Sequence, residues 1–143
     1  MNMRILFILS FFAFGLSAVP YEEILNAIKT LGRAGVEQIQ SVETVGNDKY
    51  VIVKFNETCK KNIIFISRDN GKTFFEKTIN AAQACTNFDQ IAMCNNILYV
   101  TQRTFSPYKL RVFASYNFGN DFIEIINTDI GWHDCAAERD LIQ

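Results

Sequence analysis

The sequence predicts an all-β fold in which two similar four-stranded units follow a short helix. Three observations lead to this fold. Short apolar runs alternate with turns that contain Asn, Asp and Gly, as expected for antiparallel strands. The runs and turns recur after 48 residues, so the chain contains a repeat. Thirteen Phe and five Tyr supply the large side chains that a β-rich core requires.

The N-terminus predicts a secretory signal peptide over residues 1–18. Arg4 is followed by the uncharged apolar run Ile5–Phe14 and then by small residues. The run is too short to cross a bilayer, and no later apolar segment approaches membrane length. We therefore expect a secreted protein without a membrane span, whose domain comprises residues 19–143. Cleavage after Ser17 is the alternative to cleavage after Ala18.

The charge of the chain gives no electrostatic reason to expect nucleic acid or anionic membranes as partners. Removing residues 1–18 removes one Arg and no acid, so the formal charge of the mature chain is 13 minus 15, or −2. Proteins that bind nucleic acid or anionic membranes usually carry a basic face, so neither partner is expected. A domain of this length has room for one modest core.

Four cysteines predict two disulfides with three possible pairings, because secreted chains are oxidised. These cysteines are Cys59, Cys85, Cys94 and Cys135. A zinc site is not expected, since the chain has no Cys-x-x-Cys motif and His133 is its only histidine. No cofactor is predicted. Asn56 begins an Asn-Glu-Thr sequence, which is a glycosylation site if the loop is exposed and the source is eukaryotic.

A short amphipathic helix is predicted from Pro20 to Leu31. Proline suits the first turn of a helix, and two glutamates follow it where negative charge is favourable. Ile24, Ile28 and Leu31 lie on one face at helical spacing. Gly32 and Gly35 end the helix, and the pattern beyond them changes to strands.

The repeat aligns Ser41–Ile79 with Asp89–Asn127 without a gap, which defines units at about residues 39–79 and 89–127. Seven identities fall at corresponding turns and strand ends, and the hydrophobic blocks are in register. Four short strands recurring every 40 to 50 residues are typical of β-propeller blades. The predicted strands are Ile39–Val45, Lys49–Phe55, Asn62–Ser67, Phe74–Ile79, Asp89–Cys94, Ile97–Arg103, Lys109–Ser115 and Phe122–Asn127.

The most specific motif joins the third and fourth strands of the first unit. It reads Ser-Arg-Asp-Asn-Gly-Lys-Thr-Phe, with defined positions at Ser67, Asp69, Gly71, Thr73 and Phe74. The carboxylate is expected to accept backbone N–H groups of the turn, the glycine to adopt positive φ, and the phenylalanine to return to the core. The second copy is degenerate and keeps its pattern at Ser115, Asn117, Gly119 and Phe122.

These motifs resemble the Asp box of sialidase-type (BNR) β-propellers, and the phenylalanine endings are most similar to sortilin-type receptors. The resemblance covers residues 39–127 and implies propeller-like blades. In that family the Asp box is a structural hairpin on the face away from the ligand, so its residues are expected to hold the fold and to do no chemistry.

A closed propeller needs at least four blades, whereas this chain has two and a partial third unit near Cys135–Leu141. Three arrangements remain open. Several chains could complete a ring as a homo-oligomer, the chain could be a truncated or degenerate relative of a longer protein, or its two units could pack as a sandwich with the helix over an edge. The sequence favours the second.

The resemblance also implies a ligand face opposite the Asp boxes, formed by residues 56–61, 80–88, 104–108 and 128–137. Cys59 and Cys85 would lie together on that face, which favours their pairing and leaves Cys94 without an obvious partner. The candidate contacts on or near the face are Arg103, Tyr108, Trp132 and His133.

The predicted function is a secreted non-catalytic binding module of the sortilin-like Asp-box type that recognises a protein, peptide or glycan. A sialidase-like glycoside hydrolase is the alternative, but the chain lacks the Phe-Arg-Ile-Pro signature and a recognisable arginine triad. A structural or decoy protein without a pocket is a third possibility. Trp132 could equally pack under the tail, and His133 beside Asp134 is not accompanied by a nucleophile.

Overall fold

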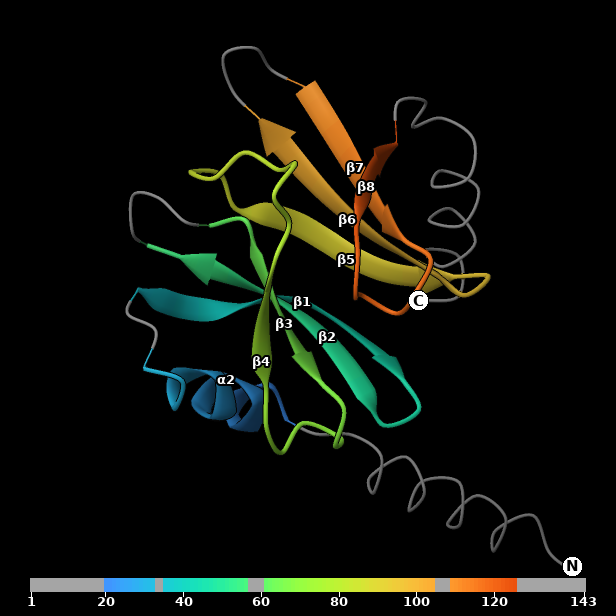
Figure 1. The fold of residues 1–143 in the computed structure, drawn as a ribbon. Helices are drawn as coiled ribbons and strands as arrows, with labels where there is room; N and C mark the ends of the chain where they lie inside the picture. Colours follow the sequence, from blue (N-terminus) through green and yellow to red (C-terminus); the bar gives the residue numbers. More distant parts are fainter. Residues whose placement is uncertain (1–19, 33–34, 57–60, 105–108, 126–143) are drawn as a thin grey trace, which may run out of the picture.

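A computed structural model describes residues 20–32, 35–56, 61–104 and 109–125. Eight strands form two separate antiparallel sheets, each a four-stranded meander in chain order. Figure 1 shows the sheets beside each other, with helix α2 (Tyr21–Lys29) on the far side of the first. The first sheet contains β1 (Val36–Val45), β2 (Asp48–Phe55), β3 (Ile63–Ser67) and β4 (Phe75–Thr78). The second contains β5 (Phe88–Cys94), β6 (Ile97–Thr104), β7 (Lys109–Ser115) and β8 (Ile123–Ile125).

The predicted all-β class is confirmed, and each predicted strand corresponds to an observed one to within a few residues at its ends. The described strands close into no barrel and no ring, so a propeller remains a proposal. The expected signal peptide and the partial third unit lie outside the described residues.

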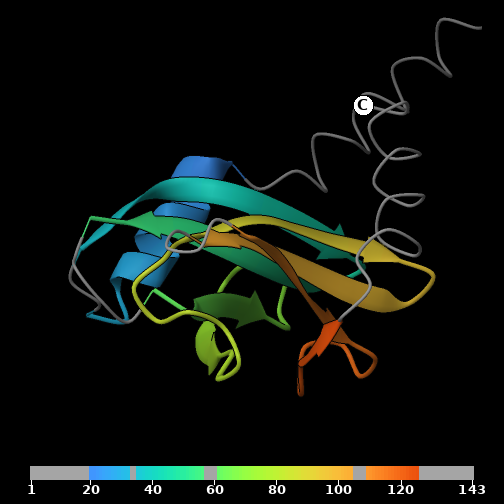
Figure 2. The ribbon, with the colours of Figure 1, turned by 90° about the horizontal axis from the view of Figure 1, so that it is seen from above.

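Helix α2 begins after Pro20, whose carbonyl accepts the N–H groups of Glu23 and Ile24. Ile24 and Ile28 are almost completely buried, as their spacing predicted. Leu31, predicted on the same face, is 43 % exposed because the helix ends at Lys29. The two isoleucines join a core cluster with the outer face of the first sheet, where Val51 and Phe65 lie. The helix therefore covers a sheet face beside β1, rather than the sheet edge considered from the sequence, because its apolar stripe needs a broad apolar surface (Figure 2).

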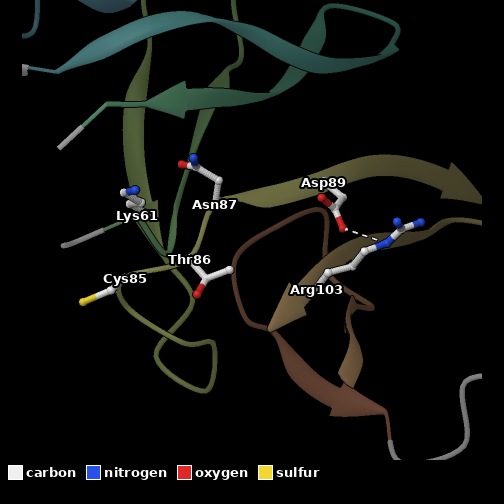
Figure 3. Close-up of a pocket in the computed structure, with 6 residues that line it drawn as sticks. All are labelled: Lys61, Cys85, Thr86, Asn87, Asp89 and Arg103. Atoms are coloured by element: carbon white, nitrogen blue, oxygen red, sulfur yellow. Dashed lines mark ion pairs between the residues drawn. The ribbon is translucent and has the colours of Figure 1, made fainter. Parts of the chain in front are cut away.

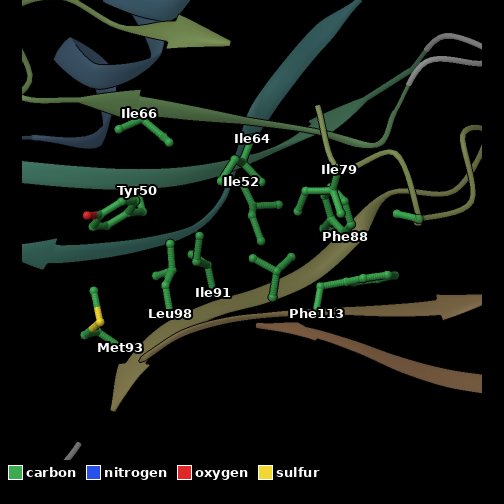
Figure 4. Close-up of a cluster of buried hydrophobic side chains, with 12 residues drawn as sticks. Tyr50, Ile52, Ile64, Ile66, Ile79, Phe88, Ile91, Met93, Leu98 and Phe113 are labelled. Carbon is green, nitrogen blue, oxygen red and sulfur yellow. The ribbon is translucent and has the colours of Figure 1, made fainter. Parts of the chain in front are cut away.

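The two sheets pack face to face through a second core cluster, whose buried side chains include Tyr50, Ile66, Leu98 and Phe113 (Figure 4). Strands β2 and β3 are each apolar on both faces. One face meets the second sheet and the other meets the helix. This arrangement explains the continuous apolar runs, since a strand exposed on one face would alternate with polar residues.

The alignment without a gap is wrong for the first two strands of each unit. The first turn separates Val45 from Asp48, and its counterpart separates Cys94 from Ile97, so these strands are offset by 49 residues rather than 48. The burial patterns of β2 and β6 are identical at that offset. A shift of one residue would reverse the faces of a strand, so burial fixes the register. Tyr50 thus corresponds to Tyr99.

The edges β1 and β5 lie side by side and are linked by side chains of β1. The Ser41 hydroxyl accepts the N–H of Ile91 at 3.2 Å, and the Glu43 carboxylate accepts the N–H of Met93 at 2.7 Å. Alternate N–H groups of an edge strand point away from its sheet and need partners. The two acceptors satisfy these groups and hold the sheets in one relative position.

Candidate functional site

The stack of sheets has two ends with different properties. One end carries the turns between β3 and β4 and between β7 and β8, where the two Asp-box sequences lie. The other carries the starts of β3 and β5 and the end of β6. We call these the box end and the loop end.

The first Asp box is closed by its own side chains. Asp69 Oδ1 accepts the N–H of Thr73 at 2.9 Å, and Oδ2 accepts the Thr73 hydroxyl at 2.6 Å. Ser67 donates to Asp69 at 2.8 Å and accepts the N–H of Gly71 at 2.8 Å. These bonds, with those from Thr73 first, lower the pKa of Asp69 from 3.8 to about 2. As predicted, the Asp69 carboxylate accepts a backbone N–H of the turn, and Gly71 has a positive φ of 89°.

The degenerate box folds in the same way. Asn117 Oδ1 accepts the N–H of Asp121 at 2.9 Å, and Ser115 accepts the N–H of Gly119 at 2.8 Å. Asn117 Nδ2 donates to the Asp121 carboxylate at 2.9 Å, which replaces the Thr73–Asp69 bond with one of opposite direction. The first box has its carboxylate at the third position (Asp69), and the second has it at the seventh position (Asp121). The turn keeps the same shape.

The first box also fastens the two sheets together. Arg68 donates to the Phe118 carbonyl at 2.6 Å and forms an ion pair with Asp48 at 2.9 Å. The Tyr50 hydroxyl donates to the same Phe118 carbonyl at 3.2 Å. The box end is thus occupied by contacts within and between the units. Phe74 is buried in the helix-side cluster, whereas Phe122 is partly buried against the cluster between the sheets.

The loop end contains a pocket of about 440 Å³ between the units (Figure 3). The first unit contributes Lys61, and the second contributes Asp89 on β5 and Arg103 on β6. The connection between the sheets supplies the rest of the lining, namely Cys85, Thr86 and Asn87.

Asp89 is the most unusual group in this pocket. It lies at a break in the β5–β6 register, and such bulges redirect side chains. Arg103 Nε is 3.4 Å from Asp89 Oδ2, yet that oxygen is buried and accepts no hydrogen bond from the described residues. The side chain as a whole is 41 % exposed, so its other atoms face the opening. Burial raises the pKa of Asp89, and the charge of Arg103 together with a hydrogen bond from the Arg103 backbone opposes this shift.

The connection that lines the pocket is held by polar side chains. Gln102 is fully buried and accepts the N–H of Gln83 while donating to the carbonyls of Gln83 and Thr86, at 2.8–2.9 Å. Asn87 exchanges two hydrogen bonds with the backbone of Phe55 at the end of β2. Arg111 is held by a bidentate pair with Glu124 and donates to Ala81 at 2.7 Å. The pocket wall is therefore fixed by both sheets.

The structure places one of the predicted ligand contacts in the pocket. Arg103 lines it, whereas Tyr108, Trp132 and His133 lie outside the described residues. Asn56 is exposed, as a glycosylation site requires, although the rest of its sequence motif also lies outside them. Lys61, Thr86 and Asn87 fall in segments that the resemblance assigned to this face. Asp89 was missed as a contact because nothing in the sequence marks a bulge at the start of a strand.

Within the described part of the chain, no group of three or more metal-binding side chains is found. Among the same residues, no helix is long and apolar enough to cross a membrane. No protein-family model, no curated protein and no solved structure matches this chain.

Proposed function

We propose that this chain is a secreted, non-catalytic binding module that recognises an extracellular protein, peptide or glycan at the loop-end pocket. The single observation that carries the proposal is the Asp89 carboxylate, one oxygen of which is buried at the pocket, 3.4 Å from Arg103 Nε, and accepts no hydrogen bond from the described residues. A buried acceptor left without a donor costs free energy unless something else satisfies it. A donor from a ligand would satisfy it.

The charges in the pocket favour a ligand with groups of both signs. Lys61 and Arg103 can bind a carboxylate, and Asp89 can accept hydrogen bonds from an amide, hydroxyl or ammonium group. A peptide segment offers all of these groups along one chain. We therefore favour a peptide or protein ligand over a glycan.

The stacking of the units supports a propeller-like relationship. Val100 and Phe113 of the second sheet, which face the first sheet, correspond to Val51 and Phe65 of the first, which face the helix. Each unit thus presents the same face toward the preceding element, as neighbouring blades do. We propose that the chain is a short propeller-like module in which α2 takes the place of a preceding blade.

The sialidase-like alternative is not favoured by the geometry. Arg68 is engaged at the box end, and Arg111 is paired with Glu124. Among the described residues, only Arg103 extends into the loop-end pocket as an arginine. A substrate carboxylate bound by several arginines would require them to converge.

The proposal is tested by immobilising the mature protein and comparing captured extracellular proteins and peptides with those captured by two variants. Lys61→Ala/Arg103→Ala removes both pocket cations, whereas Lys72→Ala removes one exposed lysine at the box end. We expect a ligand retained by the natural protein and by Lys72→Ala, with at least tenfold weaker binding to the double variant. A ligand bound equally by all three proteins, or binding to none, would contradict the proposal.

A further inference from the structure

The outer face of the second sheet is buried although the described structure places nothing on it. Its cluster contains Ala92, Tyr99, Val112 and Ala114, which are at most 6 % exposed. Every member of the cluster, including the partly buried Cys94, Ile97, Leu110 and Ile125, comes from the second sheet itself. One sheet cannot bury its own face, so another segment must cover it.

Cys94 connects this face to a second part of the chain. It packs against the cluster, and neither it nor Cys85 carries a free thiol, since both are disulfide-bonded. The two cannot bond to each other. Phe88 and Cys94 pair with opposite ends of β6 and are separated by roughly 20 Å along β5. Cys85 is three residues before Phe88, so it can lie at most roughly 10 Å closer to Cys94 than Phe88 does. The remaining distance exceeds the limit of about 7 Å between the Cα atoms of a disulfide.

Cys59 lies too far from Cys94 to be its partner. It precedes Lys61 by two residues, and the N–H of Lys61 donates to the carbonyl of Ala84 at the loop end. Ala84 is adjacent to Cys85, whereas Cys94 lies at the opposite end of β5. Two residues reach at most roughly 7 Å. Cys59 can therefore reach Cys85, and Cys135 is the remaining partner for Cys94.

We infer that this chain's own residues 126–143 cover the outer face of the second sheet, fastened there by a Cys94–Cys135 disulfide. The segment continues directly from β8, whose last residue, Ile125, borders the face. It contains apolar side chains suited to an apolar surface, including Ile130, Trp132, Leu141 and Ile142. Trp132 then contributes to this covering layer and not to the loop-end pocket. The inference does not depend on the proposed binding function.

Peptide mapping of the unreduced, mature protein tests the pairing. Cleavage before aspartate places each cysteine in a separate fragment, over residues 48–68, 69–88, 89–120 and 134–139. We expect the first to be linked to the second and the third to the fourth. Linkage of 48–68 to 89–120, or free thiols at Cys94 and Cys135, would overturn the inference.

Two further measurements test the covering itself. On a non-reducing gel the chain should migrate as a monomer, because a Cys94–Cys135 bond between copies would make the occupant a second chain and overturn the inference. Cys94→Ser/Cys135→Ser should increase the fluorescence of a dye that binds exposed apolar surface at least threefold, while Cys59→Ser/Cys85→Ser should leave it nearly unchanged. An equal response of both variants would show that the disulfide does not hold a cover on this face.

Discussion

Phe65 and Phe113 occupy corresponding positions on β3 and β7 but pack against different elements. Phe65 lies beneath α2, and Phe113 lies beneath the first sheet. The same face of each unit is therefore covered by whatever precedes it in the chain. A helix with two buried isoleucines is sufficient for the first unit, whereas the second uses a whole sheet.

The pH dependence of stability should reflect Asp69. Its pKa is about 2 in the folded protein, below its ordinary value of 3.8, so its ionised form stabilises the fold above that ordinary value. This contribution is lost as the pH falls from about 4 toward 2. The urea midpoint of the natural protein should therefore fall more steeply over this range than that of Asp69→Asn. Parallel curves for the two proteins would refute this role.

The reversed hydrogen bond of the second box predicts a rescue. In the natural protein Asn117 Nδ2 lies 2.9 Å from the Asp121 carboxylate. Asn117→Asp would place two carboxylates against each other there and should destabilise the protein by about 1 kcal/mol. Asn117→Asp/Asp121→Thr restores the pair found in the first box, so it should recover most of this loss. Urea unfolding of both variants at neutral pH measures the difference. A double variant no more stable than the single one would disprove the equivalence of the boxes.

Gly119 should tolerate substitution less well than Gly46. Both have positive φ, at 89° and 61°, so alanine is strained at either position. A methyl group at Gly119 would lie 2.9 Å from Ile66 Cδ1 and 3.2 Å from Tyr50 Cε1, whereas nothing lies within 4 Å at Gly46. Both neighbours are completely buried and have no space to move. Gly119→Ala should therefore cost about 1–3 kcal/mol more than Gly46→Ala in thermal or urea unfolding.

Asp89 should lower the stability of the folded protein and contribute to ligand binding in the pocket. Burial raises its pKa, so its charged form is disfavoured in the folded protein, and the penalty is present above the folded pKa. Asp89→Asn should therefore raise the urea midpoint at neutral pH and weaken binding of the ligand captured by the natural protein. Such an exchange of stability for function is common at binding sites. A lower midpoint in the variant would mean that Asp89 is a stabilising residue.

Much of the fold could be predicted because local signals agree with it. Asn and Gly mark the turns, the apolar runs mark strands buried on both faces, and Ile24 and Ile28 mark the buried side of the helix. The offset of 49 residues between β2 and β6 escaped the alignment, because the one identity in that part of the chain, Asn47 with Asn95, does not join equivalent positions. Strand pairing and burial show the true register.

The candidate site was predicted less completely than the fold. Arg103 was identified, but its partner Asp89 depends on a bulge, and the pocket depends on how Gln102 holds the connection between the sheets. Neither feature leaves a local pattern in the sequence. The position of a side chain at such a site follows from tertiary contacts that form only when both units are packed.

The most direct test of the account is the absolute mass of the mature protein, measured by light scattering after size exclusion. Both units that form the loop-end pocket belong to one chain, and α2 occupies the face on which a preceding unit would stack. We therefore predict a compact monomer. A stable trimer or tetramer would contradict the account, since it would mean that helix α2 is displaced and that the working site is shared between chains.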